Sequence, residues 1–323
     1  MKKFIITSQH LFGTPKLRVD HFLSLILNES KNQVNLAIKK GLVSINSKPC
    51  TKSGVLLKEG DEIILKKAQK TQIAEREEYL GEIEVLYEDE DVLVLNKPPH
   101  LVVHSAPSVK EATLVDYLKS RGFKLSNLAG EERYGIIHRL DKPTSGAIAV
   151  AKSNQAHIAL SEQLKQKTMG RYYLAITDLP LREKLEVECN MGRNPNNRLK
   201  MAKLKNGRYS KSSFAPLLEG EKASLCVAKL HTGRTHQVRL HLETLSRHIL
   251  GDELYGKKDT SSLRLMLHAY LMYFIHPISK KLVFIQAPLF EDMIGFLNQN
   301  FLAEDIDEVL SQKHILDCFG DNL

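Results

Sequence analysis

Apolar residues near the start of the chain recur with helical spacing and then alternate in short extended runs. Residues 18–27 predict an amphipathic helix, because four apolar positions share one face: Val19, Phe22, Leu23 and Ile26. A second helix is predicted over residues 31–40, with Val34 and Ile38 facing inward.

Boundary residues support this second helix and the strands that follow it. Ser30 is placed to cap the start of the helix, and Gly41 to end it. Residues 42–45 then predict a strand, the polar pair at residues 46–47 a turn, and residues 63–65 a closing strand. The start of the chain is therefore predicted to be a small α/β domain.

A polar stretch of mixed charge, Lys66 to Glu78, has no apolar periodicity and predicts a linker. The chain has 323 residues, a length that suits one small domain and one large domain. We therefore expect an N-terminal unit over residues 1–75, with its core at about 16–65, and a larger domain over residues 76–323.

Beyond the linker, β-branched runs alternate with helical patterns. The predicted strands cover residues 83–87, 92–96, 148–150, 172–176 and 283–285. A helix is predicted over residues 156–167. This order predicts an α+β fold with a mixed, largely antiparallel central sheet flanked by helices and loops.

Composition argues against membrane insertion and against disulfide or zinc cross-links. No run of about 18 apolar residues occurs, and the short apolar stretch after Lys3 is not a secretory signal. Four cysteines lie far apart without metal-ligand spacing: Cys50, Cys189, Cys226 and Cys318. We expect free thiols in a reducing cytoplasm and no bound metal.

Positive charge is concentrated at one end of the chain. Residues 1–70 contain 13 Lys and Arg against 5 Asp and Glu, which equals the net charge of +8 of the whole chain. The other 253 residues are neutral, since 46 − 13 and 38 − 5 are both 33. A basic module on a neutral body suggests a nucleic-acid anchor, although Lys-rich surfaces also occur without such a role.

A second basic segment lies in residues 189–218, which contain no Asp or Glu. Its cations are Arg193, Arg198, Lys200, Lys203, Lys205, Arg208 and Lys211. A turn at residues 194–197 predicts a hairpin or loop that can grip an RNA backbone, with Arg198 and Lys200 beside the turn. The alternative is an ordinary solvated face.

Residues 135–146 combine an apolar stretch with a polar turn. We interpret them as a strand that runs into a turn, with Asp141 at the boundary, where a side chain can be held firmly and face a cleft. Arg139 and Lys142 flank this carboxylate in sequence, and nearby cations favour its ionised form. Such a carboxylate can act as a nucleophile or a base, but a lone Asp can equally cap a turn.

The run from His138 to Gly146, His-Arg-Leu-Asp-x-x-Thr-Ser-Gly, resembles the signature of the RluA/RluD-type pseudouridine synthases. Four further segments agree in the family's order: residues 96–104, 171–175, 230–241, and 267–269 followed by 276–277. The resemblance covers about residues 80–295. Departures from the family pattern include His100 in place of a glycine and Arg171 in place of a lysine.

The resemblance implies roles for the matched residues. Asp141 is expected to be the catalytic carboxylate, and Arg239 to pair with it and keep it ionised. Tyr173 is expected to stack on the target base and to assist removal of the C5 proton. Arg139 is expected to fill the space left by the extruded base, and Arg234 to contact a phosphate or the scaffold. Apart from the resemblance, Tyr173 fits a core aromatic and Arg239 a structural ion pair equally well.

The implied reaction explains these residue types and requires no cofactor. Uracil must leave its sugar at N1, turn and reattach through C5, so no redox or group-transfer partner is needed. The base must be flipped out of a duplex and held in a pocket. His138 and His236 fit neither a metal site nor a catalytic triad, and we expect both to be structural hydrogen-bonding residues.

Residues 16–65 resemble the alpha-L RNA-binding domain, which a ribosomal protein shares with many RNA-modifying enzymes. Its marks are residues 18–23, residues 40–46 and the pair Gly60-Asp61. RNA contacts are expected from Arg18, Lys31, Lys39 and Lys40, and from Lys142 in the larger domain. Lys31 stands where the family usually has arginine, which keeps the charge but loses the planar fork.

Three hypotheses follow for function. The first is isomerisation of uridine to pseudouridine in structured RNA, with large-subunit ribosomal RNA favoured and transfer RNA next. The second is a non-catalytic RNA-binding ribosome-assembly factor, against which the set Asp141, Tyr173 and Arg239 argues. The third, an RNA methyltransferase, would need a glycine-rich cofactor loop that the sequence lacks. We expect a cytoplasmic monomer whose residues 300–323 form an acidic helical tail.

Overall fold

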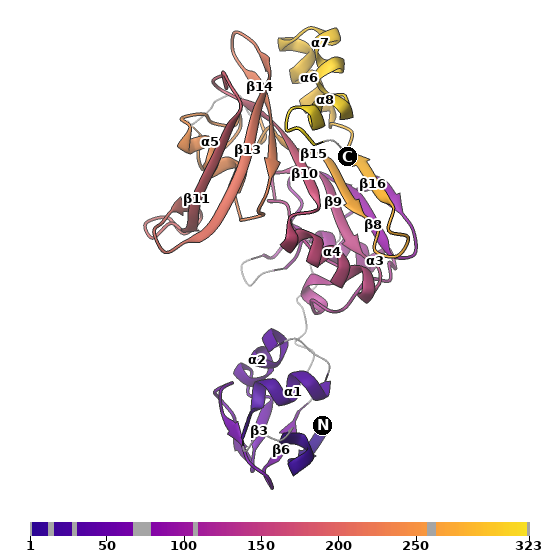
Figure 1. Cartoon of the computed structure of the whole chain (residues 1–323), viewed down its shortest axis with the longest axis vertical. Helices are drawn as coiled ribbons and strands as arrows, with labels where there is room; N and C mark the ends of the chain where they lie inside the picture. The colour runs from indigo at the N-terminus through magenta and orange to yellow at the C-terminus, as the bar shows by residue number, and fades with distance from the viewer. Residues whose placement is uncertain are drawn as a thin grey trace. The chain divides into compact units, whose positions relative to one another are not determined.

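The chain forms two compact units, which Figure 1 shows as ribbons. The computed structural model describes residues 2–11, 16–27, 31–66, 79–105, 109–256 and 263–321, without the side chains of residues 31–33. The smaller unit consists of Met1–Glu77 and Leu128–Glu131, and the larger of Glu78–Asn127 and Glu132–Leu323. Ser30 and, apart from Lys66, the predicted linker lie outside the described residues.

The smaller unit is built on short antiparallel strands. Its main sheet has the order β1–β6–β3–β4, formed by Lys2–Ile5, Glu62–Leu65, Val43–Ile45 and Lys48–Pro49. A second pair joins β2 (Leu17–Arg18) to β5 (Leu56–Leu57). The predicted turn is confirmed, because Asn46 and Ser47 have φ angles of 50° and 64° between β3 and β4. The sequence pattern does not predict β1, whose partner β6 is distant along the chain.

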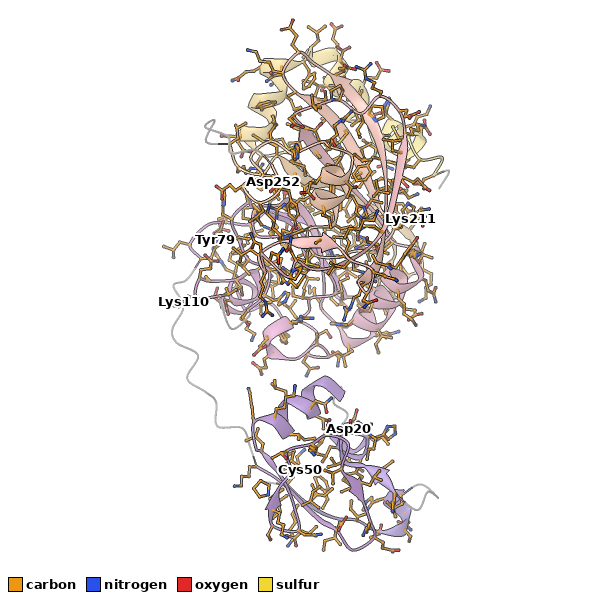
Figure 2. All side chains as sticks on the ribbon, turned by 90° about the vertical axis from the view of Figure 1, so that its left-hand side faces the viewer. Asp20, Cys50, Tyr79, Lys110, Lys211 and Asp252 are labelled. Carbon is orange, nitrogen blue, oxygen red and sulfur yellow. The ribbon has the colours of Figure 1, made fainter. Side chains whose placement is uncertain are left out.

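Two helices, α1 (Val19–Leu27) and α2 (Lys31–Lys39), confirm the predicted helical pair and follow a short 3₁₀ helix, η1 (Ser8–Leu11). They form a core with the sheet through Val19, Phe22, Leu23, Val34, Ile38 and Ile63. Ile26 is 40% exposed, so its prediction as an inward residue is wrong. In the last turn of α1, Leu25 and Ile26 are exposed, whereas Leu27 packs against the core. Figure 2 shows Asp20 and Cys50 within this unit.

One mixed sheet organises the larger unit. Its strands are β7 (Val85–Glu88), β8 (Val92–Lys97), β9 (Ser145–Ala151), β10 (Gly170–Thr177), β11 (Leu185–Arg193), β12 (Met201–Lys203), β13 (Arg208–Glu219), β14 (Ser224–Leu230), β15 (Leu267–Ile275) and β16 (Leu282–Gln286). The order is β12–β11–β13–β14–β10–β15–β9–β8–β7, with β16 also paired to β15. Among these strands only β15 and β9 pair in parallel. The predicted α+β fold with a largely antiparallel sheet is therefore confirmed.

Helices cover parts of this sheet and follow it to the C-terminus (Figure 1). They are α3 (Leu114–Ser120), the 3₁₀ helix η2 (Glu131–Arg133), α4 (Asn154–Gln166), α5 (Gln237–Thr244), α6 (Glu291–Asn300), α7 (Ala303–Val309) and α8 (Gln312–Asp317). Helix α4 packs against β9 and β15, and α5 against β13. The predicted helical tail is confirmed by α7 and α8. Within the described ranges, no helix has the length and apolarity to cross a bilayer.

Residues 135–140 do not form the predicted strand. They are irregular apart from one bridge between Ile136 and Val150, and β9 begins only at Ser145, after a turn in which the Thr144 N–H donates to the Asp141 carbonyl. Strand β8 occupies one edge of β9, whereas β15 pairs on the other edge only with Ser145 and Gly146; beyond them, this edge has the bridge to Ile136 and a bond from the Ala151 N–H to the Gly135 carbonyl. Asp141 therefore precedes a strand instead of following one.

Gly146 makes the parallel contact between β9 and β15 possible. Its φ is +109°, and a Cβ there would lie 2.3 Å from the carbonyl oxygen of Ala269. Only glycine combines this backbone conformation with so close an approach.

We predict that Gly146→Ala lowers the free energy of unfolding of the larger unit by at least about 2 kcal/mol, because strain and overlap add. Urea denaturation measures the change. Gly295→Ala is the matched control, because a Cβ at Gly295 in α6 meets nothing within 4 Å. Equal midpoints for the two variants would contradict the prediction.

Candidate active site

A cavity of about 310 Å³ lies in the larger unit, and it gathers most of the predicted catalytic residues. Asp141, Tyr173 and Arg239 all line it, as do Arg139 and Arg234. Among the described residues that line it, Asp141 is the one carboxylate, whereas the guanidinium groups are five: Arg133, Arg139, Arg171, Arg234 and Arg239. The cavity is therefore strongly positive.

The positive charge next to Asp141 comes from Arg239, which is distant in sequence, and the neutral ring of His236 lies at a similar distance. Nη1 of Arg239 lies 3.6 Å from Asp141 Oδ2, and Nε2 of His236 lies 3.9 Å from the same oxygen. The sequence neighbours do not have this role. Arg139 is exposed, and the Lys142 ammonium pairs with Glu111 at 2.8 Å. The expected pairing of Arg239 with Asp141 is thus present, as a contact longer than a direct hydrogen bond.

Asp252 holds Arg239 in place. Its two carboxylate oxygens accept from Nε and Nη2 of Arg239, both at 2.7 Å, and one of them also accepts the backbone N–H groups of Leu254 and Tyr255. Burial alone raises the pKa of the Asp252 carboxyl, but the bonds and charge of Arg239 outweigh it, so this pKa lies below its usual range. Figure 2 labels Asp252 in the larger unit. No local sequence pattern marks Asp252, because its partner Arg239 lies in α5.

His236 and His138 are hydrogen-bonding residues, as predicted. Nδ1 of His236 lies 3.0 Å from the Tyr255 hydroxyl, and Nε2 of His138 accepts the Ala149 N–H at 2.9 Å. Burial lowers the pKa of both, for His138 to about 3. Both rings are therefore neutral near pH 7, and His236 adds a dipole, not a charge, beside Asp141.

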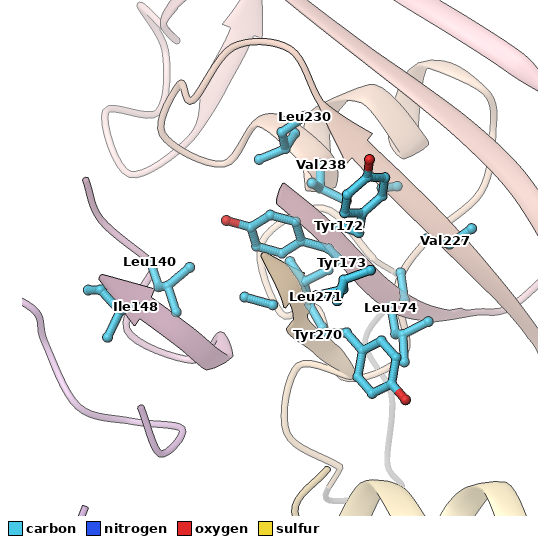
Figure 3. Close-up of a cluster of buried hydrophobic side chains, with 14 of the residues drawn as sticks. Leu140, Ile148, Tyr172, Tyr173, Leu174, Val227, Leu230, Val238, Tyr270 and Leu271 are labelled. Atoms are coloured by element: carbon cyan, nitrogen blue, oxygen red, sulfur yellow. The ribbon is translucent and has the colours of Figure 1, made fainter. Parts of the chain in front are cut away.

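Tyr173 projects from β10 into the cavity, whereas its neighbour Tyr172 points in a different direction (Figure 3). Leu230 and Val238 also line this space and provide apolar walls. Burial raises the pKa of the Tyr173 phenol to about 12. Tyr173 therefore keeps its proton at neutral pH and offers a flat ring with a polar tip.

Lys97 supports the loop that carries Asp141. Its fully buried ammonium donates to the carbonyls of Pro98, Leu101 and Lys142, at 2.7, 3.0 and 3.2 Å. Burial lowers the pKa of this amine to about 7, and the nearby Asp141 opposes that effect. Because Lys142 follows Asp141 directly, this contact fixes the backbone at the candidate catalytic residue.

The predicted basic hairpin exists and is attached to the site. Strands β11 and β12 pair from Met191 with Lys203 to Arg193 with Met201. The Tyr255 hydroxyl accepts the Met201 N–H at 2.6 Å, and the Lys200 ammonium lies 5.6 Å from the centre of the Tyr255 ring. Arg198 is exposed. Tyr255, which the sequence analysis missed, thus links the hairpin to His236 and Asp252.

The expected RNA-binding residues of the smaller unit differ in their surroundings. Arg18 forms a bidentate pair with Asp20, at 3.0 and 2.7 Å, while Lys39 and Lys40 are exposed. Lys31 begins α2, but its side chain lies outside the described residues. All four cysteines are free thiols, and the described part of the chain contains no cluster of three or more His, Cys, Asp or Glu suited to a metal.

Comparison with known families gives two matches. The RNA pseudouridylate synthase family matches residues 91–244, and the S4 domain matches residues 17–63. The first match contains Asp141, Tyr173 and Arg239, and the second contains the helices and most strands of the smaller unit.

Similar proteins extend these matches over nearly the whole chain. An uncharacterized RNA pseudouridine synthase of Helicobacter pylori is 52% identical over 329 residues, with 99% of each chain covered. Ribosomal large subunit pseudouridine synthase D of Neisseria meningitidis is 35% identical over 319 residues, covering 94% of this chain and 84% of the relative. The solved structure of human RNA pseudouridylate synthase domain containing 1 has the same fold, with a TM-score of 0.56 at 24% identity, over 72% of this chain and 96% of that one.

We predict that Asp252→Asn lowers the free energy of unfolding by about 3–5 kcal/mol at pH 7, because it leaves Arg239 as a buried, poorly paired charge. The folded pKa of Asp252 is lowered, so its contribution is complete above about pH 4 and is lost as pH falls through the folded pKa. The difference from wild type should therefore shrink in acid.

Urea denaturation at pH 7 and in acid measures this effect. Asp178→Asn is the control, because Asp178 pairs with His248 at a more exposed position, where about 1 kcal/mol or less is expected. A loss no larger than that of the control, or one independent of pH, would show that the Asp252 pair does not stabilise the fold.

Proposed function

This chain belongs to the RNA pseudouridine synthase family, and we propose that its substrate is large-subunit ribosomal RNA and its catalytic carboxylate is Asp141. It carries an S4 domain ahead of the catalytic region. The single observation that supports Asp141 is its position as the one carboxylate in a cavity lined by five arginines. The choice of RNA rests on relatives named ribosomal large subunit pseudouridine synthase D. Transfer RNA is the alternative substrate.

Asp141 acts as an anion. Arg239, fixed by Asp252, stands 3.6 Å away and directs a positive charge at this carboxylate without a direct hydrogen bond to it. The bond from uracil N1 to the sugar breaks, the base turns, and the bond from C5 to the sugar forms; the C5 proton leaves and N1 gains a proton, so the product is an isomer of the substrate. Each route through this rearrangement calls for a carboxylate beside the sugar and base, and none needs a metal or an organic cofactor.

Tyr173 holds the flipped base. Its ring faces the cavity with Leu230 and Val238 nearby, which suits stacking of a planar uracil. Because its pKa is about 12, the phenol enters the reaction protonated, which supports stacking as its first role. Arg139, exposed at the rim, fills the space that the base leaves in the RNA.

The remaining cations grip the RNA backbone. Arg198 and Lys200 do so from the β11–β12 hairpin, and Arg234 from the cavity rim, where its Nε donates to the Tyr209 carbonyl at 3.0 Å. Lys142 contributes less than its sequence position suggests, because Glu111 shares its charge. The S4 domain adds Arg18, Lys31, Lys39 and Lys40. We assign anchoring to residues 1–75 and catalysis to residues 76–323 of a cytoplasmic monomer.

The deciding experiment maps pseudouridine at base resolution in RNA from cells that lack this gene. We predict that discrete sites in large-subunit ribosomal RNA disappear and that wild type restores them, whereas Asp141→Asn does not. Asp178→Asn, outside the cavity, should restore them fully. If the restored sites lie in transfer RNA, the proposed substrate is wrong; if Asp141→Asn restores them, the proposed carboxylate is wrong.

Stacking on Tyr173 is tested by RNA affinity. We predict that Tyr173→Phe binds the mapped RNA as tightly as wild type, whereas Tyr173→Leu loses about 1–3 kcal/mol of binding free energy, which raises Kd roughly fivefold to 150-fold. Filter binding in an Asp141→Asn background removes turnover from the measurement. Equal affinity of the Leu and Phe variants would assign Tyr173 to packing alone.

A further inference from the structure

Arg171 and Tyr173 share one face of β10. They are two residues apart, so their side chains project to the same side of the strand, about 7 Å apart along it. Both line the cavity that contains Asp141. The strand therefore presents a flat ring and a cation to the same bound molecule.

The Arg171 guanidinium has no partner in the part of the chain that the structure describes. The residue is only 6% exposed, and its Nε is buried without a hydrogen bond. No carboxylate contributes to its electrostatic surroundings, in which burial lowers the pKa and only Tyr173 opposes that effect. Arginine cannot escape the cost by losing its proton, so a buried unpaired guanidinium requires an anion from elsewhere.

Two neighbouring features keep this cation open to a ligand. Gly233 lies against it, because a Cβ there would be 2.8 Å from Nη1 of Arg171. His138 adds a second unsatisfied donor. Its neutral ring accepts the Ala149 N–H on Nε2, so its proton is on Nδ1, which is buried without a partner. Both His138 and Arg171 line the cavity that contains Asp141.

We propose that Arg171, with His138 beside it, binds a phosphodiester group of the RNA strand at the target nucleotide. The inference rests on the proposed function. A phosphate carries a full negative charge and several acceptor oxygens, which suits an ionised guanidinium and an adjacent N–H. A uracil carbonyl would leave the guanidinium charge uncompensated. Tyr173, which lies on β10 with Arg171, stacks on the base of the target nucleotide. Arg171 holds the backbone of that nucleotide, and the two contacts together position its sugar against Asp141.

The first test is the salt dependence of RNA binding, measured with transcribed large-subunit ribosomal RNA in an Asp141→Asn background. Arg171→Gln should weaken binding about tenfold or more and reduce the slope of log K against log salt by about 0.7–0.9, the value of one phosphate contact. Arg171→Lys should retain most of the slope. Arg247→Gln is the matched control, since Arg247 donates to the Pro180 and Leu245 carbonyls outside the cavity. An unchanged slope for Arg171→Gln would overturn the proposal.

The second test uses inorganic phosphate and does not depend on the reaction. Phosphate, compared with chloride at equal ionic strength, should raise the unfolding midpoint of wild type more than that of Arg171→Gln. Without phosphate, Arg171→Gln should be at least as stable as wild type, because it removes an unpaired buried charge. A large loss of stability that Arg171→Lys restores would instead make Arg171 a structural residue and overturn the proposal.

The two tests separate this inference from the proposed function. If pseudouridine mapping finds no site in ribosomal RNA but phosphate stabilises wild type selectively, the anion site stands and the proposed substrate fails. If mapping succeeds while Arg171→Gln keeps the full salt slope and the full phosphate response, the reaction stands and the anion site fails.

Discussion

The buried pair of Arg239 and Asp252 is the interaction on which the geometry of the cavity depends. Asp252 engages Nε and Nη2 of the guanidinium, and only Nη1 is left to face Asp141. A guanidinium fixed in this way cannot follow the Asp141 carboxylate, so it presents a positive charge that is already in position before any substrate arrives. Preorganised charge of this kind needs no rearrangement at the moment of reaction, which is the main electrostatic advantage that a folded protein has over water.

The loop that carries Asp141 is irregular, and two contacts hold its backbone in place of the hydrogen bonds that a strand would have made. On one side, the buried Lys97 ammonium collects three backbone carbonyls, including that of Lys142. On the other, the chain enters β9 at Ser145, where Gly146 allows the close parallel approach to β15. Buried carbonyls need donors, and here a charged side chain supplies them. An irregular segment can therefore be as firmly held as a sheet strand.

Periodicity predicted the elements whose partners are close in sequence, such as α1, α2 and the β7–β8 pair, and resemblance supplied Asp141, Tyr173 and Arg239. The rest depends on contacts between distant segments. In sequence, apolar residues 135–140 fit a buried strand or a buried loop equally well, and only their limited contact with β9, one bridge between Ile136 and Val150, distinguishes the two. The sequence predicts Lys142 as an RNA contact, but its ammonium pairs with Glu111, which lies 31 residues earlier in the chain. Asp252 and Tyr255 carry no local signal, because their importance comes from Arg239, Met201 and His236 around them.

The arginines of the cavity differ in the groups that balance their charge, and this difference distinguishes their proposed roles. Arg239 is paired with Asp252, and Arg234 donates to the Tyr209 carbonyl. Arg139 is exposed to solvent, whereas Arg171 has no partner among the described residues. A protein gains no stability from a buried cation without an anion, so such a residue persists only where a ligand completes it. On the proposed function, the RNA strand supplies the missing negative charge as its base reaches Tyr173. An RNA strand that cannot place a phosphate beside Arg171 leaves the charge of this arginine unpaired. Binding of the RNA backbone at Arg171 is therefore coupled to binding of the base at Tyr173.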